Sequence, residues 1–202
     1  MRYLLISISL LCLGCGSYSK INNLQKADVS THRIVNPYFS DVKQDYVYKA
    51  NISVYKKTFS GIFIVKKLAE DHHRVVFTTE MGNKIFDFTF YNNDFKVNYI
   101  LDEINKKMLL NILKQDFKAL IENNLDVLNT FSLNDTTVFE TRIDNEKHYY
   151  YIVGKRLYKI VRTGSRKEKV VFNFSEINDN IAKHISIAHK NIKFKIKLKS
   201  IN

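Results

Sequence analysis

The sequence predicts an α+β protein that is mainly antiparallel β, in which a curved sheet of about ten strands is covered by one long helix. Two observations lead to this prediction. Apolar and polar residues alternate through most of the chain after Tyr46, as they do in half-buried strands, and near Asp102 the period changes once to about 3.6 residues, as in an amphipathic helix. The chain is also rich in Ile, Phe and Tyr, which favour strands.

Five strands are expected before the helix, most of them bounded by Gly, Asn or Asp turn residues. The clearest alternation places Phe86, Phe88 and Phe90 on one side of a strand and Asp87 on the other. Residues 62–65 are apolar on both faces and indicate a central strand. The five strands are expected at 46–56, 59–68, 72–80, 84–91 and 95–100.

The helix is expected to begin at Asp102, a good N-cap, and to end before Asn123 and Asn124. At ~1.5 Å per residue it would be ~30 Å long, enough to cross the open face of the sheet. Its lysines would face solvent. The apolar stripe expected to face the sheet consists of Ile104, Met108, Ile112, Leu113, Phe117, Leu120 and Ile121.

Strands are expected to resume after a looser section at 125–135, and a single helical turn is expected within 175–182. In the last strand Phe194 and Ile196 alternate with Lys195 and Lys197, so one face is buried and the other solvated. We interpret this lysine row first as protection of a strand edge against aggregation, and only second as a ligand-binding feature. The later strands are expected at 136–143, 148–153, 156–161, 168–174, 184–189 and 192–201.

The first 14 residues are typical of an export signal peptide. Arg2 precedes an apolar run from Leu4 to Leu13, which is too short to span a bilayer, and the small residue Gly14 follows. The tail of this segment resembles a bacterial lipobox, in which a small residue precedes the cysteine that is lipidated and becomes the first mature residue. Gly14 and Cys15 match that pattern, whereas Cys12 and Leu13 depart from it.

Lipidation of Cys15 would anchor the protein to a membrane, since two acyl chains suffice for stable attachment. Ordinary secretion, or an uncleaved anchor, remains the alternative. The two cysteines are Cys12 and Cys15, so the body of the chain after Cys15 has no thiol for a disulfide, a metal or a nucleophile. The expected organisation is a signal peptide at 1–14, a polar tether at 15–45 and a single β domain at 46–202.

The formal net charge of +12 points to anionic partners. An exported protein seldom meets nucleic acid, so anionic lipid head groups or lipopolysaccharide are the nearer candidates, and simple solubility is the alternative.

Catalytic and metal-binding motifs are not found in the sequence. It contains no Gly-x-Ser-x-Gly elbow, no glycine-rich phosphate loop and no His-Glu-x-x-His, so we expect no enzyme, no cofactor and no metal. His184 and His189 are five residues apart, but no cysteine or carboxylate cluster accompanies them. A hydrolase assembled from distant loops is the remaining alternative.

The aromatic rows leave two readings open: they line an apolar cavity, or they form a packed core. Under the first reading, the predicted cavity residues are Ile62, Ile64, Phe77, Phe86, Phe88, Phe90, Leu113 and Phe117.

The segments FSGIFIVKK, RVVFTTEMGNKIFDFTF and the ending HISIAHKNIKFKIKLKSI resemble the LolA/LolB type of bacterial lipoprotein carriers and acceptors. The resemblance covers about residues 46–201 and implies a half-open β-barrel (half-barrel) closed by helices over an apolar cavity for acyl chains. It implies an outer-membrane lipoprotein facing the periplasm that binds lipid or acyl chains. The alternative is a non-catalytic subunit of a cell-envelope assembly with a filled core. The expected partners are the membrane, a lipid or acyl chain and other envelope proteins, but not nucleic acid.

We expect the mature chain to begin at Cys15 and this cysteine to be diacylated. Intact-mass analysis of the protein from membranes checks this, and Cys15→Ser is expected to release it into the soluble envelope fraction. A mature mass that corresponds to another first residue would contradict the prediction.

Overall fold

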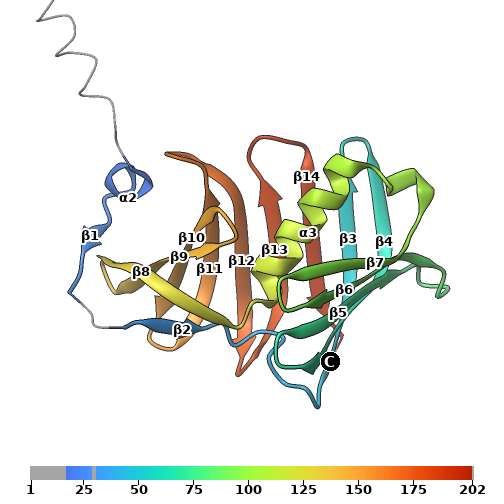
Figure 1. Cartoon of the computed structure of the whole chain (residues 1–202), viewed down its shortest axis with the longest axis horizontal. Coiled ribbons are helices and arrows are strands. Elements are labelled where there is room, and N and C mark those ends of the chain that lie inside the picture. The colour runs from blue at the N-terminus through green and yellow to red at the C-terminus, as the bar shows by residue number, and fades with distance from the viewer. Residues whose placement is uncertain (1–16, 29–30, 202) are drawn as a thin grey trace, which may run out of the picture.

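The computed structural model describes residues 17–28 and 31–201 (Figure 1). The predicted signal peptide and Cys15 lie outside the described residues. Within the described residues, no helix is both long and apolar enough to cross a membrane.

The main element is one open antiparallel sheet of 14 strands rather than the predicted ten or so. Its order is β1-β8-β9-β10-β11-β12-β13-β14-β3-β4-β5-β6-β7, and β2 pairs with another part of β8. The strands are β1 (Gln25–Lys26), β2 (Arg33–Val35), β3 (Asp45–Val54), β4 (Lys57–Ala69), β5 (His72–Thr78), β6 (Lys84–Tyr91), β7 (Asp94–Ile100), β8 (Asn124–Leu133), β9 (Thr136–Ile143), β10 (Glu146–Val153), β11 (Arg156–Thr163), β12 (Glu168–Asn178), β13 (Ile181–His189) and β14 (Phe194–Ser200).

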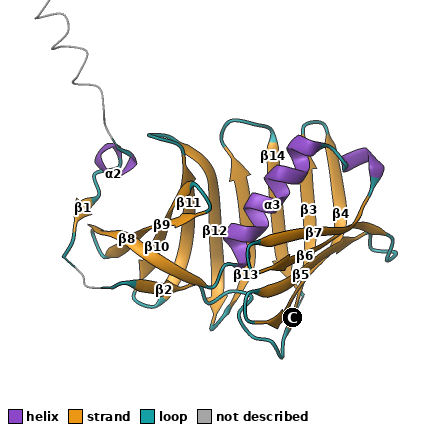
Figure 2. Cartoon of the chain, in the orientation of Figure 1, coloured by secondary structure: helices purple, strands orange, loops and turns teal. Residues whose placement is uncertain are grey.

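Helix α3 (Lys107–Ile121) connects the two ends of this sheet, because it follows β7 and precedes β8. Figure 1 shows β8 on one side and β5–β7 on the other side of the longer strands, with α3 between them. In Figure 2 it is the one long helix against a sheet made of strands. Besides α3, the described residues contain α2 (Tyr18–Ile21) and a 3₁₀ turn, η2 (Asp102–Ile104). The architecture is therefore a curved sheet with one helix on its concave face.

The curvature is built into the strands. A Cβ at Gly61 would lie 1.9 Å from the carbonyl oxygen of Thr78, so only glycine allows β4 to approach β5 this closely. The register of β5 against β6 also shifts between Phe77 and Thr78, which is where a β-bulge increases the bend.

Most of the predicted alternation is confirmed. In β6, Phe86, Phe88 and Phe90 are buried on the concave side. In β14, Phe194 and Ile196 are buried while the intervening lysines are exposed. All strands predicted from Tyr46 onward are present, with bounds that differ by a few residues.

The helix differs from its prediction, because α3 begins at Lys107 and not at Asp102. Asp102 is instead the first residue of the 3₁₀ turn, and non-helical residues separate this turn from α3. The predicted stripe assumed one continuous helix from Ile104, so it assigned the wrong residues to the buried face at the start of α3. As a result Leu109, and not Met108, points to the sheet, and Met108 is 56% exposed.

Two segments that were expected to be loose or helical form strands and a hairpin. Residues 125–135 belong mostly to β8, and the expected helical turn at 175–182 is instead the hairpin between β12 and β13. In β7, a register shift places Ile100 opposite Phe86 and Tyr99 opposite Asp87, so Tyr99 leaves the inner face.

The segment expected to be a polar tether packs against the sheet within its described part. Tyr18 is 2% exposed, and its hydroxyl lies 2.9 Å from that of Tyr151. Tyr38 and Phe39 are also buried, and β1 and β2 extend the edge of the sheet beside β8. The segment is polar on average, so its composition did not predict these contacts, which are made by a few aromatic residues.

The space under the C-terminal half of α3 is filled by aromatic rings. Phe117 lies 5.3 Å from Phe63 and 5.5 Å from Phe86, measured between ring centroids. Phe86 stacks on Phe88 at 4.7 Å with nearly parallel planes. These separations are typical of packed aromatic cores.

A buried ion pair holds α3 onto the sheet. Asp116 of α3 is fully buried, and its carboxylate lies 3.0 Å from Nη2 of Arg162 on β11 and 2.7 Å from Nε2 of His189 on β13. A carboxylate in such a place is stable only if it is paired, because desolvation of an unpaired charge costs several kcal/mol. Asp116 was not among the residues predicted from the sequence to matter. It lies on the buried face of α3, among apolar residues.

We expect Asp116→Asn to lower the free energy of unfolding by about 3–5 kcal/mol, because Arg162 would keep a buried charge without its partner. Urea unfolding measures the change. Asp126→Asn is the matched control, since Asp126 pairs with Arg33 at 3.3 Å on the exposed surface, where such a pair contributes ~0–1 kcal/mol. Equal effects of the two substitutions would contradict the assignment.

Candidate functional site

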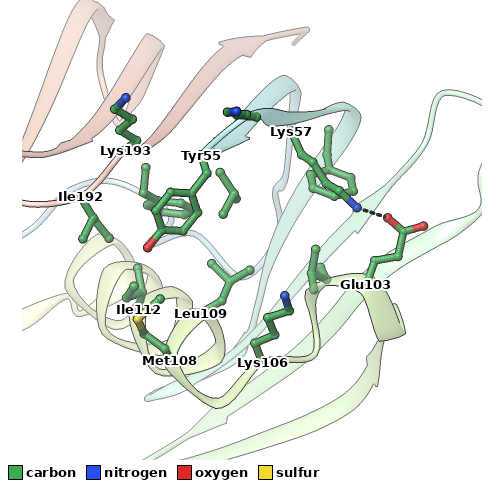
Figure 3. A pocket seen from close by; sticks show the side chains of 14 residues that line it. Tyr55, Lys57, Glu103, Lys106, Met108, Leu109, Ile112, Ile192 and Lys193 are labelled. Carbon is green, nitrogen blue, oxygen red and sulfur yellow. Dashed lines mark hydrogen bonds and ion pairs between the residues drawn. The ribbon is translucent and has the colours of Figure 1, made fainter.

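An apolar pocket of about 460 Å³ opens beside the N-terminal half of α3 (Figure 3). The helix forms one wall, and the β3–β4 and β13–β14 turns form the other. Most of the lining is aliphatic or aromatic, with lysines around it. The lining residues are Val54, Tyr55, Lys56, Lys57, Phe59, Glu103, Ile104, Lys106, Met108, Leu109, Ile112, Ile192, Lys193 and Phe194.

The pocket exists because the two ends of α3 are buried to different extents. From Asp116 to Ile121 every residue is buried, whereas Met108 is exposed and Ile112 is only half-buried. The N-terminal half of the helix therefore leaves room between itself and the strands, and that room is the pocket.

Tyr55 stands at the mouth in an unusual backbone conformation. Its φ of 53° lies in the left-handed region, which is uncommon for a bulky residue. Its N–H donates a hydrogen bond of 2.8 Å to the carbonyl of Lys193, so the two turns of that wall are joined. Figure 3 shows the ring reaching across the pocket towards α3, and 58% of the residue is exposed. An exposed aromatic ring held over an apolar pocket offers contact area to a ligand.

The charge around the pocket is mostly positive. Lys57 and Glu103 neutralise one another through a 3.0 Å ion pair. Lys56, Lys106 and Lys193 are exposed and form no ion pair with any described residue.

None of the eight residues predicted to line a cavity lines this pocket. Phe77, Phe86 and Leu113 border only a deeper void of about 10 Å³, which is too small for a ligand, and Phe88, Phe90 and Phe117 lie in the packed core. Ile62 and Ile64 are half-buried on the opposite face of β4 from Phe63 and Val65. The predicted cavity lay between the aromatic rows. In the structure the aromatic rings themselves fill that part of the interior.

The residues that line the pocket lie at the ends of strands and of the helix, where sequence periodicity carries little information. Val54 and Ile192 could have been noted as apolar residues directly beside lysine-containing turns. Met108 was predicted to be buried against the sheet and is instead an exposed residue of the pocket wall.

A second, polar pocket of about 180 Å³ lies beside the C-terminal half of α3. It is lined by Gln115 and by His148 and Arg162, which are neighbours across β10 and β11. Nε2 of His148 and Nη1 of Arg162 are buried there without a hydrogen-bond partner among the described residues. Its volume is below the usual range of ~300–1,000 Å³ for ligand pockets, so the apolar pocket is the better candidate site.

The histidines do not assemble a metal centre. His189 is bound to Asp116, whereas His184 lies 3.3 Å from Glu176 at the other end of β13. In the part of the chain that the structure describes, no group of three or more His, Cys, Asp or Glu residues could hold a metal ion.

The fold of this chain is similar to that of several solved structures. The LolA superfamily protein NE2245 from Nitrosomonas europaea aligns with a TM-score of 0.54 over 78% of this chain and 83% of its own, at 9% sequence identity. The fold is similar to that of the LolA superfamily. This likeness confirms the predicted structural resemblance, and at this identity it concerns the fold alone.

Two further solved structures align less well. A DUF1329 family protein from Desulfovibrio piger gives a TM-score of 0.43 at 9% identity, over 81% of this chain and 86% of its own. A putative outer membrane lipoprotein-sorting protein domain from Vibrio parahaemolyticus gives 0.44 at 9% identity, over 78% and 83%. Neither a protein-family model nor a curated protein matches the sequence.

We expect the unfolding free energy of this domain to decrease as the pH falls from about 6.5. Burial lowers the pKa of His148 to about 3, with a further contribution from the charge of Arg162, and burial lowers the pKa of His73 to about 4. Because both pKa values lie below the ordinary one, the unfolded chain binds protons that the folded chain does not, and each histidine contributes a slope of up to ~1.4 kcal/mol per pH unit.

His148→Asn tests this. The Asn side chain can still donate to the carbonyl of Glu146, to which Nδ1 of His148 donates at 3.0 Å. Urea unfolding between pH 4.5 and 7 should show a shallower pH dependence for the variant, whatever its stability at pH 7. Parallel curves for the two proteins would contradict the prediction.

Proposed function

We propose that this protein binds acyl chains, or another lipid-like molecule with a long apolar part, in the pocket beside α3, and that it is a carrier or acceptor and not an enzyme. The observation that carries the proposal is the apolar pocket of about 460 Å³ between α3 and the β3–β4 and β13–β14 turns. Its size falls within the ~300–1,000 Å³ typical of sites for small ligands. The LolA-like fold supports a role in lipoprotein sorting or lipid handling.

Binding would be non-covalent sequestration. Met108, Ile112 and Tyr55 expose apolar surface that a chain would remove from water, and each Å² of such surface contributes ~25 cal/mol. No bond is made or broken, so the site needs no nucleophile or general base.

We place the protein in the cell envelope, anchored through a lipidated Cys15 to the outer membrane on its periplasmic side. Only Gly16 and Ser17 separate Cys15 from Tyr18, which is buried against β10 and β12 through Tyr151 and Glu168. Three residues of chain reach at most ~11 Å. An anchor at Cys15 would therefore hold the part of the sheet against which Tyr18 packs close to the bilayer.

The alternative is a non-catalytic subunit of an envelope assembly with a filled core. The stacked phenylalanines under the C-terminal half of α3 favour it, because they leave no continuous void beneath the helix. In that case the exposed apolar residues at the pocket would contact a partner protein and not a lipid.

Ile112→Trp distinguishes the two functions. The larger side chain fills the pocket from the helix wall, and we expect it to weaken binding of the uncharged fluorophore N-phenyl-1-naphthylamine, and of a fluorescent fatty acid, by at least about tenfold. Leu128→Trp is the control, since Leu128 is an exposed apolar residue of β8 away from the pocket. Native mass spectrometry should also find lipid on the wild-type protein from membranes. Absence of bound lipid and of fluorophore binding would overturn the proposal.

A further inference from the structure

The pocket combines an apolar floor with an unbalanced ring of charge. Of the charged residues that line it, four are lysines and one is an acid. The acid, Glu103, is already paired with Lys57. Three lysines are thus left with no opposite charge among the described residues, and they surround an opening whose interior is aliphatic and aromatic.

These three lysines lie on both walls. Lys106 precedes α3 on the helix wall, while Lys56 and Lys193 belong to the two turns of the strand wall. Figure 3 shows the amino group of Lys106 directed into the space between the walls. Because a lysine side chain is long and flexible, amino groups from both walls can approach one acidic group at the mouth.

The lysines that serve solubility are distributed differently. Those on β14 (Lys195, Lys197 and Lys199) form an exposed row on the outer face of the sheet. The prediction that this row protects a strand edge is wrong, because β14 pairs with β13 on one side and with β3 on the other. The rim lysines are not part of such a row, because they come from three separate segments and meet only in the folded protein.

We propose that the pocket selects amphiphiles with an anionic head group, and that Lys56, Lys106 and Lys193 hold that group while the chain lies against Val54, Ile112 and Phe194. This inference rests on the proposed function and adds the chemical class of the ligand. A carboxylate and a phosphate diester share the required charge. A neutral or cationic head group would leave three like charges at the mouth uncompensated.

Three amphiphiles with the same chain test the proposal: oleate, oleyl alcohol and oleylamine, each displacing N-phenyl-1-naphthylamine from the full mature chain. We expect oleate to bind at least about tenfold more tightly than oleyl alcohol at low salt, oleylamine to bind most weakly, and the preference to shrink in 1 M salt. Uptake of fluorescent phosphatidylglycerol, but not phosphatidylcholine, from vesicles would assign a phosphate head group. Oleate binding without that uptake would assign a carboxylate.

The variant Lys56→Gln/Lys106→Gln/Lys193→Gln should lose about tenfold in oleate affinity and keep oleyl alcohol affinity within about twofold. The control Lys195→Gln/Lys197→Gln/Lys199→Gln removes the same charge from the outer face and should change neither. All six lysines are exposed, so both variants should fold, which circular dichroism verifies.

Three results would overturn the inference. If oleyl alcohol binds as tightly as oleate and the rim variant behaves like wild type, the pocket takes chains without regard to charge and the proposed function stands alone. If the outer-face variant loses as much oleate affinity as the rim variant, overall charge and not the rim is responsible. If no amphiphile displaces the fluorophore, the proposed function itself fails, and the inference fails with it.

Discussion

The ion pair between Asp116 and Arg162, with His189 as a second partner, is the interaction on which the rest of the arrangement depends. It fixes the C-terminal half of α3 against β11 and β13 from a position where an unpaired charge is strongly unfavourable. The aromatic rings of Phe63, Phe86 and Phe117 close around the same half of the helix. In the N-terminal half, Leu109 and Leu113 are buried, but Met108 is exposed and Ile112 is only half-buried. The pocket lies beside this less completely buried half of the helix.

This arrangement reconciles two readings of the aromatic rows. They do form a packed core, and the protein nevertheless has a pocket, because the two features occupy different parts of the same concave face. A sheet that does not close leaves its concave face accessible at the ends. The single helix covers most of that face but reaches only about 22 Å at ~1.5 Å per residue. Room for an apolar chain thus remains at the β3–β4 end.

In the proposed function, the part of the sheet around β8 to β12 orients the protein at the membrane. There the N-terminal segment packs through Tyr18, and β1 and β2 cover the edge of β8. Edge coverage of this kind blocks pairing with other chains. It also brings residue 17 to the sheet surface, so that an anchor at Cys15 would hold this part of the domain at the membrane. A polar segment of 30 residues would not impose such an orientation if it were free along its length.

Sequence alone determined the type of the elements and most of the faces that they bury, because strand and helix periods are local properties: Phe86, Phe88 and Phe90 had to share a side of their strand, and Lys195 and Lys197 had to share the other side of theirs. It also determined the resemblance to the LolA fold, which the solved structure from Nitrosomonas europaea supports. Only the tertiary structure decided where α3 begins, that Asp116 is buried, that Tyr18 packs on the sheet and where space remains, because each of these depends on contacts between residues far apart in the chain. The lysines at the pocket mouth are the plainest case: in sequence they are three among many, and only the fold brings Lys56, Lys106 and Lys193 to one opening.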